Sequence, residues 1–396
     1  MRTLRWNARL VLVALLSLCL LAPAWAEAPT NVVLLVGDGM GPEQVKAAGL
    51  YANDEASTLA MEKHYVGTMT THSADRGGAN KGATDSAAAG TAMATGHKTD
   101  NGIVSQTPHG EVLPTVLEVF ARAGKRTGLV TTCPMTHATP ACFGAHVAKR
   151  SRYGDIAEDY FKRSRPNVLF GAYYKGDRGV TEEKARRAGY AVVTTRDALA
   201  ALLKQTDPDA DLHVSGQFAP GMIPWEYDGP LPEEGKKKRR HGEPSDAAFD
   251  TVPHLSEMAH AALRLLVPDP EGFFLMIEGG TIDWACHDNC IQRCVAETVE
   301  FDNTCRLVLD WAGRRDDTLV IITADHECGG LKVIEGRGKG EMPEVAWSTG
   351  GHTDVPVPVY AVGPGAERLE GEVDNTDLFG VMTGRAVPAA AEAVAR

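Results

Sequence analysis

The sequence predicts a three-layer α/β fold in which helices cover both faces of a mainly parallel central sheet. Short apolar runs rich in Val, Ile and Leu alternate with longer amphipathic stretches over most of the 396 residues. This alternation is typical of parallel sheets with helical crossovers. Polar residues follow directly after several apolar runs, at the edge where open α/β sheets place their functional sites.

The individual elements follow from the same pattern. Apolar runs predict buried strands over 31–36, 127–132, 273–277, 319–323 and 357–362. Amphipathic stretches predict helices over 114–123, 156–162, 182–188, 199–204, 254–266 and 289–312. The window 207–250 breaks the pattern, because it is rich in Pro, Gly and charged residues and includes the basic run 236–240. We expect it to be a surface insertion in one domain spanning 27–396, with the basic run forming a solvated loop.

The first 26 residues predict a secretory signal peptide. Arg2, Arg5 and Arg9 give a basic start, an apolar run covers 10–21, and the segment from Ala24 to Ala26 offers a small-residue cleavage site. A retained membrane anchor is the alternative, but the run is short for a bilayer span. No later stretch is long and apolar enough to cross a membrane. We therefore expect a periplasmic or secreted protein with no membrane association after removal of the signal.

The chain is acidic, with a formal net charge of −12 at pH 7. The predicted signal peptide carries three arginines and no acidic residue, so its removal leaves −15. A negative overall field is unfavourable for nucleic-acid binding, and we expect no nucleic-acid-specific function. If the substrate is an anion, bound metals and a few arginines must attract it locally.

Seven cysteines remain after the signal peptide, so at least one thiol is unpaired. Export favours disulfides, and Cys133 and Cys142, which bracket a Pro-containing loop, are the expected pair. Cys286, Cys290 and Cys294 recur every four residues and would share one helix face. They lack the Cys-x-x-Cys spacing of thiolate metal sites, so we expect them to be buried or disulfide-bonded.

Five short segments place hard oxygen donors, imidazoles and one hydroxyl beside small, turn-forming residues. They cover 36–40, 84–88, 278–287, 323–327 and 350–353. This set of side chains suits two zinc ions and a harder third metal around a serine nucleophile.

Ser86 is the candidate nucleophile. It follows Asp85 and precedes an Ala-rich stretch that predicts a helix. Its hydroxyl would therefore lie at a helix N-terminus, where free amides and the helix dipole favour an anion. The simpler interpretation is an ordinary N-cap serine. No Gly-x-Ser-x-Gly elbow surrounds Ser86, so the sequence favours activation by a metal.

The candidate metal ligands fall into two sets. Asp283 and His287 are spaced i, i+4 and would share one face of a helical turn. With the distant His352 they make a three-ligand zinc set with an open position. The ligands suited to a second zinc are Asp38, Asp325 and His326. Each residue alone is more often structural, but together and at strand ends they indicate a metal site.

In combination, these segments resemble the zinc-dependent alkaline phosphatase superfamily, and in particular its secreted bacterial alkaline phosphatases. The match runs from Asn31 through the segment 375–379. The resemblance implies an alkaline-phosphatase-like fold and metal-dependent hydrolysis of phosphate monoesters at alkaline pH, through a phosphoserine on Ser86 and with release of inorganic phosphate. It implies two Zn²⁺ and one Mg²⁺ with the following ligands: Asp283, His287 and His352 for the first zinc, Asp38, Asp325 and His326 for the second, which Ser86 faces, and Asp38, Thr139 and Glu278 for magnesium. Arg150 matches the arginine that clamps the phosphate in this family.

The chain departs from the best-known bacterial pattern at two positions. His137 stands where that pattern has an aspartate near the magnesium site, and Trp284 stands where it has a lysine. Because imidazole suits zinc better than magnesium, the third site could hold Zn²⁺ instead. Cys328, two residues after His326, is also unexpected. We expect it to be packed away, and the alternative is that it perturbs zinc binding. Relatives are commonly dimers, so a homodimer stays open, although no residue pattern indicates an interface.

Other functions fit the residues less well. A phosphodiesterase of the same superfamily would use the same metals. Arg150 favours monoesters, because an additional arginine binds a dianion more strongly than it binds a monoanionic diester. A sulfatase would need a Cys/Ser-x-Pro-x-Arg motif, which the segment around Ser86 lacks. A metal-storage protein would need ligands but neither Ser86 nor Arg150.

Overall fold

The computed structural model describes residues 29–75, 82–174, 176, 179–207, 212–227, 229–230 and 248–385. Its largest sheet contains, in chain order, β1 (Asn31–Gly37), β2 (Tyr65–Thr70), β3 (Arg126–Pro134), β4 (Val168–Tyr173), β5 (Ala191–Val193), β6 (Val214–Pro220), β7 (Phe273–Gly279), β8 (Thr318–Thr323), β13 (Val357–Val362) and β14 (Gly371–Asp374). The spatial order is β14-β2-β13-β8-β1-β7-β3-β4-β6-β5.

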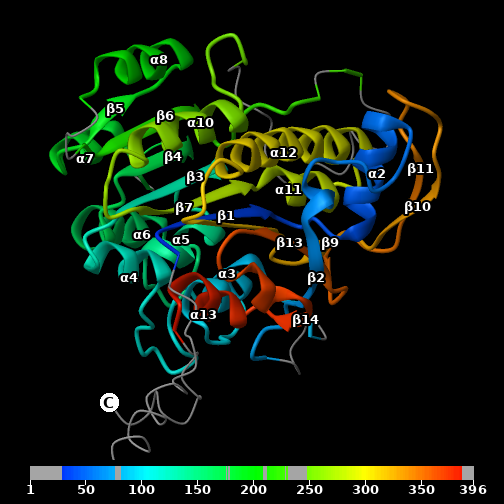
Figure 1. Ribbon diagram of the computed structural model, residues 1–396, viewed down its shortest axis with the longest axis horizontal. Coiled ribbons are helices and arrows are strands. Elements are labelled where there is room, and N and C mark those ends of the chain that lie inside the picture. The colour runs from blue at the N-terminus through cyan, green and yellow to red at the C-terminus, as the bar shows by residue number, and fades with distance from the viewer. Residues whose placement is uncertain are drawn as a thin grey trace, which may run out of the picture.

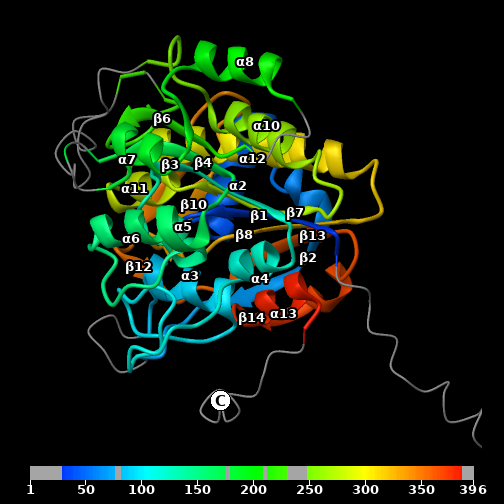
Figure 2. The ribbon, with the colours of Figure 1, turned by 90° about the vertical axis from the view of Figure 1, so that its left-hand side faces the viewer.

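Helices surround this sheet. They are α2 (Pro42–Asn53), α3 (Ser86–Thr95), α4 (Val116–Arg122), α5 (Ala138–Gly144), α6 (Tyr153–Asp159), α7 (Glu182–Arg187), α8 (Arg196–Gln205), α10 (Leu255–Leu266), α11 (Thr281–His287), α12 (Ile291–Ala312) and α13 (Asp377–Thr383). In Figures 1 and 2, α10 and α12 cover one face of the sheet, whereas α3, α4 and α13 cover the other. The predicted three-layer α/β class is confirmed.

The centre of the sheet is parallel and fully buried. β1 lies between β7 and β8 and runs parallel to both, and every residue of β1 is buried. Val36 pairs with Glu278 on one side and with Thr323 on the other. The three strands therefore end level with one another, which brings the residues that follow them to one edge.

The expected strands correspond to β1, β3, β7, β8 and β13, and the expected helices to α4, α6, α7, α8, α10 and α12. The helix expected over 156–162 continues beyond α6 as a π-helical turn, Tyr160–Ser164. The outer strands β2, β4, β5, β6 and β14 were not predicted. β13 pairs antiparallel with β8 and β2, so the sheet is mainly rather than wholly parallel.

The expectation that 207–250 forms a surface insertion is wrong for part of that window. Residues 214–220 form β6, a largely buried strand between β4 and β5 in the large sheet. Ser215, Gly216 and Gln217 interrupt its apolar character, which hides the strand in the sequence. The basic run 236–240 lies outside the described residues, as does the predicted signal peptide. None of the helices in the described part of the chain is long and apolar enough to cross a membrane.

The predicted Cys133–Cys142 pair is also wrong. Both residues are free, buried thiols, like the other cysteines in the described part of the chain. The Cys142 thiol donates to the carbonyl of Ala87 at 3.1 Å, so it packs against α3 instead of bridging the loop. Cys286, Cys290 and Cys294 are buried, as expected, but they do not share one helix face. Cys286 lies on α11, Cys290 is the N-cap of α12 and Cys294 lies on α12, with the sulfurs of Cys286 and Cys294 3.6 Å apart.

Two short sheets complete the edge above the strand ends. β10 (Leu331–Glu335) pairs with β11 (Glu344–Trp347), and β9 (Glu327–Cys328) pairs with β12 (His352–Thr353). The second of these ribbons is short, but it joins two segments that carry candidate ligands.

Candidate active site

The candidate ligands gather at the carboxyl edge of the central strands. Asp38 follows β1, Glu278 is the penultimate residue of β7, and Asp325 follows β8. The backbone amide of Asp38 donates to Gly279 at 3.3 Å, which ties the end of β1 to the end of β7. All three carboxylates are 0% exposed. The strand register therefore places three acidic groups together in the interior.

Ser86 is the first residue of α3. The N-cap is Asp85, whose carboxylate accepts a hydrogen bond from the Ala88 amide at 2.9 Å. The N-cap interpretation of Ser86 is therefore wrong, because Asp85 fills that position. Ser86 is only 2% exposed, and its hydroxyl oxygen lies 3.4 Å from Nε2 of His326. The hydroxyl thus faces the candidate ligands from a helix N-terminus.

One group of ligand atoms comes from α11 and β12. His287 Nε2 lies 3.3 Å from Asp283 Oδ2, and His352 Nε2 lies 3.5 Å from Asp283 Oδ1. The two imidazoles approach to 3.1 Å through their Nε2 atoms. Helix α11 confirms the predicted turn that puts Asp283 and His287 on one face. The structure therefore brings together the three residues expected at the first zinc.

Backbone carbonyls orient both of these imidazoles. The Nδ1 group of His287 donates to Gly350 at 2.9 Å, and that of His352 donates to Thr84 at 2.7 Å. Each contact fixes the tautomer and directs Nε2 toward Asp283, as second-layer hydrogen bonds do in metal sites.

A second group adjoins the first. His326 Nε2 lies 3.5 Å from Asp38 Oδ1 and 3.3 Å from Asp325 Oδ2. Asp325 is held by the amides of Gly39 and His326 at 3.1 and 3.0 Å. The rings of His326 and His352 stack with centroids 3.6 Å apart, so the two groups share a boundary.

A third group lies on the other side of Asp38. Ligand atoms of Asp38, His137 and Glu278 all lie within 4.8 Å of one another. Thr139, at the start of α5, is fully buried, and Thr131 donates to Glu278. The residues expected at the magnesium site are therefore close to His137.

Burial and mutual repulsion oppose the ionisation of these carboxylates in the metal-free chain. Burial, and next the charges of Asp325 and Asp283, raise the pKa of Asp38 well above its ordinary value. Burial raises the pKa of Glu278 to about 7 and, with the charge of Asp283, that of Asp325 to about 6. Among the described residues, no hydrogen-bond donor reaches either carboxylate oxygen of Asp38. Buried carboxylates without donors fit bound cations, which would neutralise them.

The imidazoles of the site differ from one another in the direction of their pKa shifts. Burial lowers the pKa of His352, but hydrogen bonding to Asp283 outweighs it and takes the value to about 9. Burial and the neighbouring charge of His352 lower the pKa of His326 well below its ordinary value. Burial alone would raise the pKa of Asp283, yet His287 and His352 lower it well below its ordinary value. His326 is therefore the imidazole most ready to act as a neutral ligand.

Arg150 approaches the site beside α3. Its Nη1 donates to Asp85 Oδ2 at 2.9 Å, and its Nη2 donates to Nε2 of His137 at 3.1 Å. Asp85 thus caps α3 and holds the arginine with one carboxylate. Asp85 was not predicted as a site residue. Its signal in the sequence was an aspartate directly before a predicted helix, the usual pattern of an N-cap.

The two unexpected residues next to the ligands are also buried. Trp284 is 8% exposed and packs edge to face on His137, with ring centroids 5.8 Å apart. The sulfur of Cys328 lies within 4.8 Å of ligand atoms of Asp283, His287 and His352, and it contacts the carbonyl of Asp283 at 3.8 Å. Cys328 is packed away from solvent, as expected, but close to the first group.

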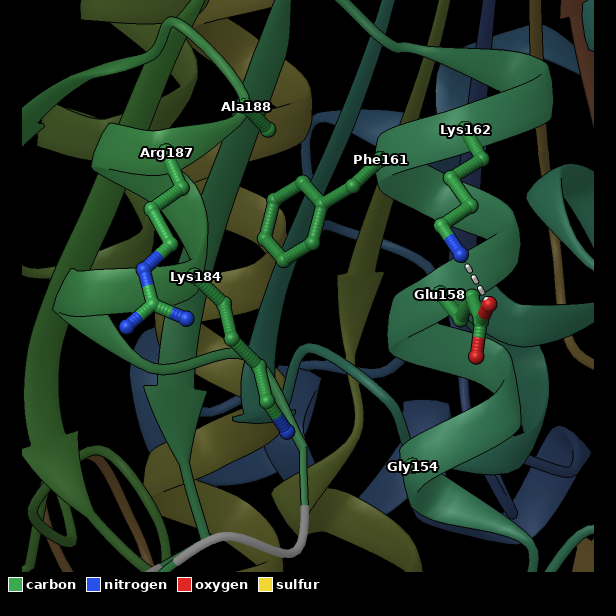
Figure 3. A pocket seen from close by; sticks show the side chains of 7 residues that line it. All are labelled: Gly154, Glu158, Phe161, Lys162, Lys184, Arg187 and Ala188. Carbon is green, nitrogen blue, oxygen red and sulfur yellow. Dashed lines mark hydrogen bonds and ion pairs between the residues drawn. The ribbon is translucent and has the colours of Figure 1, made fainter.

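The candidate ligands lie apart from a surface hollow on another part of the molecule. A hollow of about 420 Å³ lies between α7 and the segment from α6 through the π-helical turn, as Figure 3 shows. Its walls include Phe161 and Lys184, and Lys162 on its rim pairs with Glu158. None of the predicted site residues lines it, so we base the function on the ligand groups and not on this hollow.

The fold and the site together define a class of protein: an α/β enzyme with a buried serine at a helix N-terminus among candidate metal-binding side chains. The chain belongs to the alkaline phosphatase family, which matches residues 29–168 and 160–341. It is a phosphatase, and its class of reaction is the hydrolysis of phosphate monoesters.

Curated relatives cover most of the chain. Streptomycin-6-phosphate phosphatase of Streptomyces griseus is 36% identical over 96% of this chain and 97% of its own length. Alkaline phosphatase 3 of Bacillus subtilis is 32% identical over 88% and 87%. Alkaline phosphatase of Escherichia coli is 31% identical over 89% and 85%.

Solved structures agree with the sequence relatives. The cold-active alkaline phosphatase from a psychrophilic Shewanella matches with a TM-score of 0.74 and 27% identity, over 89% of this chain and 98% of that one. The alkaline phosphatase from the Antarctic bacterium TAB5 matches with a TM-score of 0.72 and 26% identity, over 90% and 97%. A variant of the latter was solved with Mg bound in a site named M3.

Proposed function

We propose that residues 27–396 form one catalytic domain that hydrolyses phosphate monoesters at alkaline pH through a phosphoserine on Ser86. The observation that carries this proposal is the 3.4 Å approach of the Ser86 hydroxyl to Nε2 of His326, at the N-terminus of α3. A buried serine in that position meets both a ligand group and free helix amides, which favour an attacking oxygen and an anionic substrate.

The donor sets fit two zinc ions and a third, harder metal. Asp283, His287 and His352 would hold one zinc, and Asp38, Asp325 and His326 the other. Asp38, Thr139 and Glu278 would hold magnesium, or zinc if His137 joins as a ligand. When bound, such ions stabilise negative charge on the attacking and leaving oxygens and lower the pKa of a hydroxyl.

The protein's own groups perform the remaining tasks. Ser86 loses its hydroxyl proton and its oxygen forms a bond to phosphorus, while the ester oxygen of the substrate departs as an alcohol. Water then attacks the phosphoserine, so that inorganic phosphate leaves and Ser86 regains its proton. Arg150 donates to two oxygens of the phosphoryl group, a task that its planar fork suits, and Asp85 holds that fork in place.

Arg150 favours monoesters over diesters. A monoester dianion has one more charged oxygen than a diester. The second hydrogen bond from the arginine therefore stabilises a bound monoester more than a bound diester. A phosphodiesterase of the same superfamily stays the alternative. Comparing p-nitrophenyl phosphate with its bis-ester, with and without a chelator, separates the two. We expect a monoester preference of more than about a hundredfold in kcat/KM, lost on chelation, whereas the reverse preference would support the diesterase.

We further propose that the enzyme acts in the periplasm or outside the cell on small phosphate monoesters, after the signal peptide of residues 1–26 has been removed. A homodimer is compatible with this proposal. Size-exclusion chromatography with light scattering on the exported chain measures its oligomeric state, and sequencing of its N-terminus tests cleavage before Glu27.

A further inference from the structure

We propose that Glu327 is a positioning residue that holds His326 and His352 at the spacing needed for metal binding. The inference rests on the proposed function, because it concerns residues that would hold the zinc ions. Glu327 follows His326 directly in the sequence, yet none of the expected ligand sets includes it.

The carboxylate of Glu327 is buried and fully occupied by donors from distant segments. The residue is 3% exposed. Oε1 accepts from Gln44 Nε2 at 2.7 Å and from the Leu331 amide at 3.2 Å. Oε2 accepts from the Gly330 amide at 3.2 Å and from the hydroxyl of Thr353. A buried carboxylate is stable only with such partners, so its removal leaves several donors unpaired.

These hydrogen bonds hold the two strands of the β9–β12 ribbon together. Glu327 lies opposite Thr353 in the ribbon register, and Cys328 lies opposite His352. His326 precedes β9 directly, and His352 is the first residue of β12. The bond from Thr353 to Glu327 therefore joins the segment that carries an imidazole of the second group to the segment that carries one of the first.

Gln44 extends the clamp to α2 and α11. Its side-chain amide donates to the carbonyl of Cys328 at 2.7 Å as well as to Glu327, and it lies 3.8 Å from the sulfur of Cys286. Cys286 lies on α11 between Asp283 and His287. One amide on α2 thus contacts two of the segments that surround the candidate ligands, β9 and α11.

Gly41 provides independent evidence that the position of Glu327 matters. A Cβ atom added at Gly41 would lie 2.3 Å from Cγ of Glu327. The backbone of Gly41 is extended, with φ −84° and ψ −178°, so other residues could adopt it. The space that a side chain would fill is taken by Glu327.

The four donors to the Glu327 carboxylate are all neutral groups, namely three amides and one hydroxyl. Neutral donors hold the anion beside groups that would bind two zinc ions. A buried negative charge next to a metal site favours cations through the low local dielectric. Glu327 would therefore support metal retention both by geometry and by charge.

The test measures zinc affinity rather than turnover. Wild type, Glu327→Gln, Glu327→Ala and Gly41→Ala are prepared as full-length protein, stripped of metal, and titrated with zinc against a chromophoric chelator. We expect zinc dissociation constants to rise about 10- to 100-fold in the Glu327 variants, as for other second-layer partners of metal ligands. Gly41→Ala, which displaces the carboxylate without removing it, should also weaken binding.

Glu43→Gln is the matched control. Glu43 lies on α2 near Gln44 and accepts from the Val333 amide at 2.7 Å, so the variant removes a nearby charge outside the β9–β12 ribbon. Its zinc affinity should stay within about twofold of wild type. Thermal unfolding of the metal-free forms measures the purely structural cost of each variant.

Unchanged zinc affinity in the Glu327 variants, with a lower unfolding temperature alone, would overturn the inference. If neither Glu327 variant yields folded protein, Thr353→Val decides, because it removes a single hydroxyl from the clamp. Weaker zinc binding in that variant is expected, and unchanged binding would overturn the inference. These results are independent of the nucleophile, so loss of the phosphoserine mechanism would leave them interpretable.

Discussion

Asp85 accepts a hydrogen bond from Arg150 at 2.9 Å with the same carboxylate that caps helix α3. The other carboxylate oxygen accepts from the amides of Ala88 and Gly102 at 2.9 and 3.0 Å. The helix that presents Ser86 and the arginine that would bind phosphate are therefore fixed to each other. A change at Asp85 should disturb both.

Asparagine and alanine at position 85 should separate these two effects. Asp85→Asn keeps an oxygen for the Ala88 amide but loses the charge that holds Arg150, so we expect normal folding and a decrease of about tenfold in kcat/KM. Asp85→Ala should in addition lower the free energy of unfolding by about 1 kcal/mol, the usual cost of a lost N-cap. Steady-state kinetics and thermal unfolding measure the two losses. Equal kinetics in Asp85→Asn and wild type would contradict the positioning of Arg150.

The residues that the sequence revealed are those whose role follows from local context. Asp38 and Asp325 follow buried strands of a parallel sheet, and Asp283 and His287 share one helical turn. Their positions in the sequence therefore predict that the members of each pair lie close together. Asp85 could be recognised only as a helix cap. Its second role depends on Arg150, which lies 65 positions further along the chain.

Other features depended on distances that no local pattern encodes. Cys133 and Cys142 bracket a loop in sequence, but their side chains pack elsewhere, since Cys142 faces Ala87. The strand β6 was missed because polar and small residues occupy it, and only its neighbours β4 and β5 reveal that it is buried. Both features depend on contacts between residues that are far apart in the sequence.

Removal of Arg150 should weaken monoester hydrolysis more than diester hydrolysis. Arg150→Ala deletes two charge-assisted hydrogen bonds to the phosphoryl group, and we expect kcat/KM for p-nitrophenyl phosphate to fall about a hundredfold, or about 3 kcal/mol. The bis-ester should change by less than about tenfold, because it carries less charge. Arg150→Lys should be intermediate, since an ammonium group cannot bind two oxygens in a planar fork. Equal losses on both substrates would argue against the clamp.

His137 should determine which metal occupies the third group. Its imidazole lies with Asp38 and Glu278, and imidazole favours zinc whereas carboxylate oxygen favours magnesium. We expect His137→Asp to bind magnesium more tightly than wild type, by about tenfold or more. Metal analysis after dialysis against mixed zinc and magnesium measures this preference. The account of the third group is wrong if the variant keeps the metal content of wild type.

Zinc uptake by the metal-free chain should release protons at neutral pH. At pH 7 the His352 imidazole of the first zinc group, with a pKa of about 9, is protonated, and the Asp38 carboxyl of the second, whose pKa burial raises well above its ordinary value, holds its proton more tightly than a free aspartate does. Both must lose their protons to bind a metal. We therefore expect zinc affinity to increase between about pH 6 and pH 9, with about one to two protons released per chain at pH 7. Calorimetry in buffers of different ionisation enthalpy counts them, and uptake without proton release would contradict these protonation states.

Without metal, the stability of the fold should change with pH in the opposite direction. Asp325 and Glu278 have raised pKa values, so their contribution is fully present below their unfolded pKa values and is lost as the pH rises through about 6 to 7. The contribution of His352 is present below its unfolded pKa and is lost as the pH rises through about 9. The lowered pKa of Asp283 acts only in acid, where its contribution is lost as the pH falls below about 4. His326 acts in the opposite sense, because its lowered pKa makes its contribution present above about pH 6.5 and lost as the pH falls below it. The raised pKa values of Asp325, Glu278 and His352 together outweigh it, so unfolding of the metal-free chain at pH 5 and pH 8 should show a less stable protein at pH 8.

The central claim is that the oxygen of Ser86 attacks phosphorus and carries the phosphoryl group. The most direct measurement is an acid quench during turnover of p-nitrophenyl phosphate, followed by mass spectrometry of the peptide that contains Ser86. The account predicts one phosphoryl group on Ser86 in wild type and none in Ser86→Ala, which should bind zinc normally and lose most turnover. An unmodified Ser86 under conditions that trap the intermediate, together with undiminished turnover in Ser86→Ala, would contradict it.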